Sequence, residues 1–211
     1  MSLNAIRLHA VRVVVCALVA LAVCPALAQA PARVPLTAAD ADRCERKLHA
    51  LQRYAEERAA RKAVDPQLTT TLTEAEINSY LRLKIAGDFP AGVVEPYVTG
   101  LGDGRVTASA IVDLDAVSKS GSGGSLGRML GGRLPLTISG TLRGRGGNAT
   151  FELDSATLTG IPVPKMLLQQ IVGYYSKSVD KPSGVNLDAP FPLPNGIRQL
   201  DIGLHQVVLV Q

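Results

Sequence analysis

Hydrophobic residues follow first a helical spacing and then an alternating one. Over residues 37–63 they recur at every third or fourth position, which predicts one long amphipathic helix whose other faces carry charges of both signs. Residues 68–72 form a threonine-rich, strand-like run. The next four residues, Thr73-Glu74-Ala75-Glu76, are a capping box. A short second helix is therefore expected to begin at Thr73.

The middle of the chain predicts two β-hairpins. Residues 106–114 alternate strictly between apolar and polar side chains, which is the clearest period-two pattern in the sequence. The strand before it, over residues 93–101, carries Pro96, which favours an edge or a bulge, and Gly102-Asp103-Gly104 is a hairpin turn. A second hairpin is expected over residues 134–158. Its apolar phase slips near Ser155, which indicates a bulge or a twist.

A third helix and two further strands complete the pattern. Gly160-Ile161-Pro162-Val163-Pro164 leads into a helix over residues 165–177 with one broad apolar face, followed by a strand at 185–187 and a long strand over 200–210. Because hairpins dominate, we expect an α+β fold, in which a largely antiparallel sheet has helices on one face.

The first 28 residues have the features of a secretory signal. Arg7 and Arg12 precede an apolar run over residues 13–23, and Ala26-Leu27-Ala28 is a small-x-small cleavage site. A retained membrane anchor is the alternative; a lipidated Cys24 is disfavoured by the bulky Val23. The predicted division is a signal peptide at 1–28, a linker and charged amphipathic helix at 29–66, and an α+β domain at 67–211. The mature protein is expected to be periplasmic or secreted.

Composition and motifs narrow the chemistry. Hydrophobic residues make up 46% of the chain and charged residues 19%, and there is no tryptophan, which fits one globular domain. The signal carries two arginines and no acidic residue, so its removal lowers the formal charge from +4 to +2. This small charge, the few aromatic residues and the export signal exclude a nucleic-acid partner.

Catalytic and metal-binding signatures are missing from the sequence. After signal removal Cys44 is the single cysteine and His49 and His205 are the only histidines, so no intramolecular disulfide can form. Gly-x-Ser-x-Gly, Cys-x-x-Cys and His-Glu-x-x-His motifs are absent, and the glycine-rich residues 118–133 lack the Gly-Lys-Ser/Thr end of a phosphate loop. We therefore expect a protein that is not an enzyme and has no cofactor, metal site or catalytic residue.

The aliphatic strands are the remaining candidate site. A curved sheet facing the helix over residues 165–177 can leave an elongated cleft, and aliphatic walls suit acyl chains, which gain about 0.8 kcal/mol per buried CH₂. The same side chains could instead close on one another as an ordinary core, and a cavity of several hundred Å³ would distinguish the two. The candidate lipid-binding residues are Val106, Ala108, Ala110, Val112, Leu136, Ile138, Phe151, Leu153, Leu167, Ile171 and Tyr175.

Several segments beyond the signal carry a family resemblance. They are Leu72-Thr73-Glu74-Ala75-Glu76-Ile77-Asn78-Ser79-Tyr80-Leu81, the alternating strand at 106–114, the hairpin at 134–158, Gly160-Ile161-Pro162-Val163-Pro164, and Pro192-Leu193-Pro194-Asn195-Gly196-Ile197. In this combination residues 68–211 resemble the LmeA-like and YceB-like exported proteins. The charged helix at 37–63 is not part of that pattern, and it could be an added lid or a partner surface. The absence of a lipidation site distinguishes this chain from the YceB-like lipoproteins.

The resemblance implies a tubular lipid-binding (TULIP-like) half-barrel: a long curved antiparallel sheet wrapped around the helix over residues 165–177, with lipid chains held between them. It implies a phospholipid or similar amphiphile as ligand, transient membrane contact, and a role in lipid transport or envelope maintenance. The competing hypothesis is a non-enzymatic envelope assembly or scaffold protein, whose core is closed and whose charged first helix carries the interaction.

We predict that the exported chain is cleaved after Ala28, because the short apolar run and the small-x-small site coincide there. N-terminal sequencing of the periplasmic protein should give Gln29 as the first residue. A chain that still begins at Met1, or one that carries lipid on Cys24, would contradict the prediction.

Overall fold

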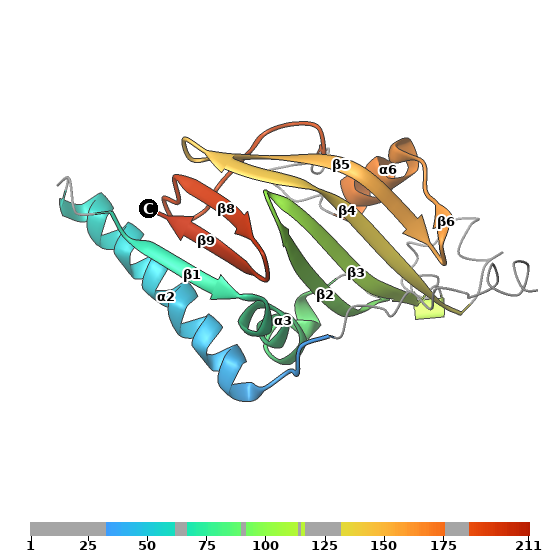
Figure 1. The fold of residues 1–211 in the computed structure, drawn as a ribbon, viewed down its shortest axis with the longest axis horizontal. Helices are drawn as coiled ribbons and strands as arrows, with labels where there is room; N and C mark the ends of the chain where they lie inside the picture. The colour runs from blue at the N-terminus through green and yellow to red at the C-terminus, as the bar shows by residue number, and fades with distance from the viewer. Residues whose placement is uncertain (1–32, 62–66, 90–91, 114, 117–131, 176–185) are drawn as a thin grey trace, which may run out of the picture. The chain divides into compact units, whose positions relative to one another are not determined.

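The computed structural model describes residues 33–61, 67–89, 92–113, 115–116, 132–175 and 186–211 (Figure 1). The chain divides after Arg33, and residues Val34–Gln211 form the unit described below. The predicted signal peptide and most of the glycine-rich segment lie outside the described residues.

Three helices and nine strands make up the described unit, and every strand pair is antiparallel. The helices are α2 (Ala38–Arg61), α3 (Glu74–Leu83) and α6 (Lys165–Tyr175), with a 3₁₀ turn η1 at Ala86–Asp88. The strands are β1 (Thr69–Thr73), β2 (Val93–Gly102), β3 (Arg105–Asp113), β4 (Arg133–Arg145), β5 (Asn148–Leu158), β6 (Ile161–Pro162), β7 (Phe191–Pro192), β8 (Gln199–Gly203) and β9 (Gln206–Val210). The predicted α+β class and antiparallel sheet are confirmed.

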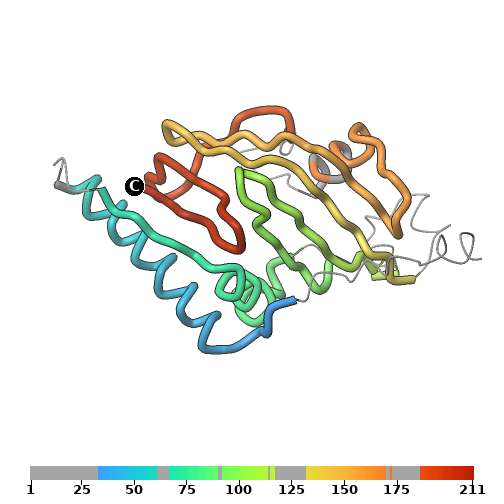
Figure 2. The backbone as a smooth tube through the Cα atoms, viewed as in Figure 1, coloured from blue at the N-terminus to red at the C-terminus, as the bar shows by residue number. Residues whose placement is uncertain are grey.

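The sheet joins two sets of strands. β2, β3, β4 and β5 follow one another as long antiparallel neighbours, and β1, β9 and β8 form a shorter set beside them (Figures 1 and 2). The two sets meet where Gly144 of β4 pairs with Leu200 of β8, and again at a bridge between Leu101 and Leu204. α2 and α3 pack together beside the shorter set.

The C-terminal region differs from the prediction of one long strand over residues 200–210. The chain reverses between Gly203 and Gln206, so that β8 and β9 form a hairpin. The turn depends on His205, whose φ of 54° lies in the left-handed region. Apolar alternation continues up to the turn and resumes after it, which is why the pattern resembled a single strand. The prediction of a strand over residues 185–187 is also wrong, because Asn186 and Leu187 lie in a loop. Val185 is outside the described residues.

Both predicted irregularities of the long strands are confirmed. In β2 the register with β3 shifts between Val94 and Tyr97, around Pro96 and Glu95, which has a φ of 56°. In β5 the register with β4 shifts next to Ser155.

The filled core lies between the helices and the shorter strands. One stripe of α2 supplies Cys44 and Leu51, and these are buried with Leu72 of β1, Leu209 of β9 and Ile197. The apolar spacing predicted for the first helix is therefore the face that packs. Since this stripe contributes to the main core, α2 is an integral part of the unit.

An ion pair between the partly exposed Lys47 and the buried Glu76 joins α2 to the start of α3. Glu76 is only 4% exposed, and Lys47 Nζ lies 2.8 and 2.7 Å from its two carboxylate oxygens. The same lysine donates to the Thr71 carbonyl, and Thr73 and Glu76 complete the predicted capping box. Burial raises the pKa of Glu76, but the hydrogen bonds from Lys47 and the Thr73 amide lower it more, so the net pKa lies below its ordinary value.

We predict that Glu76→Gln removes part of the acid sensitivity of folding. Because the folded-state pKa is lowered, Glu76 contributes stability that is fully present above its unfolded pKa and is lost as pH falls through the folded value. At neutral pH the variant should lose about 1–3 kcal/mol of unfolding free energy. Urea unfolding of both proteins from neutral to acidic pH should show the difference shrinking below about pH 5. The exposed Glu152→Gln is the matched control, and a constant difference at all pH values would contradict the prediction.

Candidate functional site

The register of β3, β4 and β5 places all eight strand residues predicted for the site on one face of the sheet. Ala110 is opposite Leu136 and Ala108 is opposite Ile138 across the β3–β4 pair. Directly paired residues point to the same side of a sheet, so the rows can be followed from strand to strand. The apolar face consists of Val93, Val98, Val106, Ala108, Ala110, Val112, Leu134, Leu136, Ile138, Leu142, Phe151, Leu153, Ala156 and Leu158. Val93, Val98, Leu134, Leu142, Ala156 and Leu158 were not predicted for the site.

A β-bulge at Asp154 keeps this face apolar along the whole of β5. Ser139 is opposite Ser155, but the next residue of β4, Gly140, is opposite Leu153, so Asp154 is the extra residue. Without a bulge, side chains at odd and even positions would point to opposite sides. The inserted residue therefore brings Phe151 and Leu153 to the same side as Ala156 and Leu158.

The opposite face of these strands is mainly polar, with the directly paired Ile111 and Pro135 as apolar members. Thr107 and Ser139 are directly paired, and their hydroxyl oxygens lie 3.0 Å apart. Thr137 and Thr157 form another pair on this side. The sheet is therefore two-sided, as expected when one face meets water and the other an apolar partner.

The apolar face is separate from the filled core. Every one of its members except Ala156 is partly exposed, whereas the buried cluster around Cys44 and Leu51 lies among α2, β1 and β9. A closed core would bury the central side chains of the strands. The described residues thus leave a broad aliphatic surface incompletely covered.

Small residues make the apolar surface uneven. Ala108 and Ala110 are neighbours along one side of β3, between the larger Val106 and Val112. At Gly140 the ring of Phe151 takes the place of a side chain, because two of its carbons would lie 2.5 and 2.7 Å from an added Cβ. The aliphatic surface is low at the alanines and raised at Phe151.

The helix predicted to face the sheet lies against β5 (Figure 1). Leu168 is 3% exposed, and Leu167 and Val172 are partly exposed. Of the three helix residues predicted for the site, Leu167 is partly exposed, while the side chains of Ile171 and Tyr175 lie outside the described part. The main contacts of α6 are with this one strand, a narrower arrangement than the expected wrapping of the sheet around the helix.

A cavity of about 180 Å³ lies at the other end of the apolar face, where the two sets of strands meet. It is smaller than the several hundred Å³ expected, and Val106 is the one predicted site residue among its described lining. Glu74 and Gln206 are its polar side chains, and the rest of its lining is Ile77, Val98, Gly100, Val106, Leu142, Leu200, Ile202 and Val207.

Beside this cavity a polar cluster links three elements that are distant in sequence. Glu74 is buried and accepts hydrogen bonds from the Tyr97 hydroxyl at 2.8 Å, while His205 Nδ1 lies 2.6 Å from its other oxygen. The backbone of His205 also bonds to Glu74 and to Gly100. Sequence reasoning missed this cluster because 131 residues separate Glu74 from His205. Among the described residues no serine, threonine or cysteine side chain bonds to His205, so the cluster ties α3, β2 and the β8–β9 turn together.

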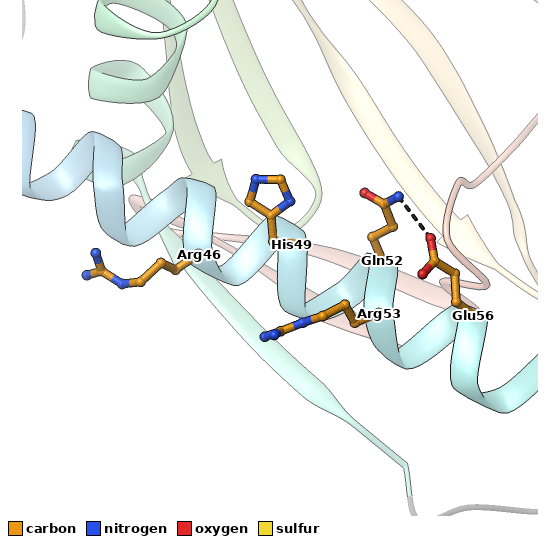
Figure 3. Close-up of a pocket in the computed structure, with 5 residues that line it drawn as sticks. All are labelled: Arg46, His49, Gln52, Arg53 and Glu56. Atoms are coloured by element: carbon orange, nitrogen blue, oxygen red, sulfur yellow. Dashed lines mark hydrogen bonds between the residues drawn. The ribbon is translucent and has the colours of Figure 1, made fainter.

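The outer side of α2 carries a separate row of polar side chains (Figure 3). All five are exposed, and Gln52 donates a hydrogen bond of 3.0 Å to Glu56. They border a surface hollow but come from one helix and carry charges of both signs, so they do not converge on a common point. The row consists of Arg46, His49, Gln52, Arg53 and Glu56.

Comparisons with known proteins do not establish a family. No protein-family model matches the chain, and no curated protein matches it significantly. Among solved structures, a crystal structure of lipopolysaccharide binding protein is similar at 16% identity and a TM-score of 0.20. The similarity covers 68% of this chain and 40% of that one. Two chains with so low a TM-score share no demonstrated fold, and the resemblance to LmeA-like and YceB-like proteins stays an expectation.

The described residues hold no candidate metal site and no candidate membrane span. Nowhere in those ranges do three His, Cys, Asp or Glu side chains gather as a metal ion would require. Likewise, none of the described helices is long and apolar enough to cross a membrane.

We predict that Cys44 is an unreactive packing residue. The side chain is 2% exposed, and burial raises the pKa of the thiol to about 11, with the nearby Glu76 adding to the shift. The thiolate, which is the reactive form, is therefore scarce at neutral pH. Cys44→Ala should cost about 1 kcal/mol or more of stability through lost packing and leave ligand binding unchanged. Native protein should resist thiol alkylation until urea unfolds it; rapid alkylation of the folded protein would contradict the prediction.

Proposed function

We propose that the protein binds a phospholipid or similar amphiphile, with the acyl chains against the apolar face of β2–β5. The observation that carries the proposal is the separation of this face from the filled core. Its aliphatic side chains are in register across four strands and yet remain partly exposed. Partly exposed apolar side chains that gather on one face of a sheet are typical of binding sites for apolar partners.

The shape and chemistry of the face favour hydrocarbon over a polar ligand. Its members are aliphatic apart from Phe151, and an acyl chain gains about 0.8 kcal/mol for each CH₂ removed from water. Ala108 and Ala110 provide a low central region in which a chain can lie. The cavity at Val98, Val106 and Leu142 extends the same surface between the two sets of strands.

The predicted export signal bears on where the protein would meet its lipid ligand. A chain that carries a secretory signal and acts in the periplasm meets phospholipids on both sides of that compartment. We propose a non-enzymatic carrier for lipid transport or envelope maintenance. The tubular architecture implied by the family resemblance, in which α6 covers the acyl chains, belongs to this proposal.

The scaffold hypothesis predicts a different state of the apolar face. It requires that the apolar face close on itself or on α6 and that the exposed side of α2 carry the interaction. Partial exposure along β3 and β4 favours an open face. The mixed charges on α2 remain the surface on which a scaffold would depend.

We predict that Ala110→Phe reduces amphiphile binding severalfold with little change in stability. The phenyl ring would fill the low region at the centre of the face, and an open surface can accept it without strain. Binding of a fluorescent fatty acid and the urea midpoint should be measured on the same preparations. Ser155→Phe is the matched control, because Ser155 is exposed and lies opposite Ser139 on the polar side.

A closed core gives the opposite pattern. There the added ring would overpack the interior and cost about 1–3 kcal/mol of unfolding free energy. That loss of stability, together with no binding by the wild type, would reject the lipid proposal in favour of the scaffold.

A further inference from the structure

Two of the most exposed large hydrophobic side chains lie close together in sequence, where β5 leads into α6. Ile161 is 69% exposed and Met166 is 73% exposed. The segment between them consists of Pro162, Val163, Pro164 and Lys165. We call residues 159–166 the apolar tip.

The apolar tip continues the proposed lipid-binding face. Ala110 is paired with Leu136, Leu136 with Leu158, and Leu158 with Ile161. This row runs from β3 to β6 without a polar residue, and its last member is the exposed Ile161. An acyl chain on the face could therefore reach the tip without crossing polar side chains.

Several backbone donors of the tip are absent or already hydrogen-bonded. Pro162 and Pro164 have no N–H group. The amides of Thr159 and Val163 donate to Pro135 and Ala156, and those of Leu167 and Leu168 both donate to Pro164. Unpaired backbone groups are costly in hydrocarbon, so the missing or bonded donors at Thr159, Pro162, Val163 and Pro164 lower the cost of bringing this part of the tip to a lipid surface.

The apolar tip and its ion-pair partner carry no net charge. Lys165, the charged residue of the segment, is paired with Asp188. A surface without net charge is not attracted to an acidic partner at long range. The exposed apolar side chains, not charge, would supply the attraction.

From these observations we infer that the apolar tip inserts into the surface of a lipid bilayer and is the point at which amphiphiles pass between the membrane and the apolar face. The inference rests on the proposed function and adds its membrane-contact site. Two inserted side chains give a weak, reversible attachment, which a carrier needs in order to leave the membrane again.

The test compares vesicle binding with ligand binding in paired variants. Ile161→Ser/Met166→Ser should weaken flotation with vesicles of equal parts phosphatidylglycerol and phosphatidylethanolamine by about tenfold or more. Binding of a monomeric short-chain phosphatidylcholine should change little. The control is Leu101→Ser/Leu204→Ser, which removes the exposed pair that bridges β2 to the β8–β9 turn. Added salt should not release the wild type.

A second measurement covers the case in which the serine variant does not fold. The chain has no tryptophan, so Ile161→Trp places a single reporter at the tip. Its emission should shift to the blue on addition of vesicles and be quenched by brominated lipid, whereas that of Leu204→Trp should not.

Undiminished flotation of the serine variant, or no response of the tryptophan at 161, would overturn the membrane-contact site. If instead vesicle binding depends on the tip while the wild type binds no short-chain phospholipid, the contact site stands and the lipid-binding proposal fails.

Discussion

The fold depends on a core that is filled without help from the long strands. Leu51 and Cys44 of α2 pack with Leu72 and Leu209. The ion pair between Lys47 and the buried Glu76 joins α2 to the capped start of α3. Because this packing stabilises the unit, the aliphatic side of β2–β5 does not have to be buried within the chain. The protein can keep an apolar surface available, which a single shared core would not allow.

One inserted residue decides how large that surface is. Asp154 shifts the phase of β5, so that Phe151 and Leu153 join Ala156 and Leu158 on the side of Ala108 and Ala110. The cavity at the junction of the strand sets, the alanines at the centre and Ile161 at the far edge then lie along one continuous apolar face. The cavity, the low region at the alanines and the apolar tip are parts of one surface.

Periodicity predicted the local structure well and the long-range contacts poorly. The alternation of β3, the capping box at Thr73 and the slip near Ser155 are set by neighbouring residues, so the sequence could reveal them. The C-terminal turn depends on a left-handed His205, and the Glu74–His205 contact joins residues far apart in sequence. The sequence pattern also could not show whether the apolar side of the strands is covered or exposed. A strand that packs against a core and a strand that lines an open binding face have the same alternation of apolar and polar residues.

The central claim is that the apolar face of β2–β5 holds an amphiphile. Mass spectrometry of the mature protein under native conditions, after purification without detergent, tests it most directly. The account predicts a retained phospholipid or similar amphiphile that organic extraction removes and added lipid restores. A protein that carries no amphiphile and takes up none when lipid is supplied would contradict it.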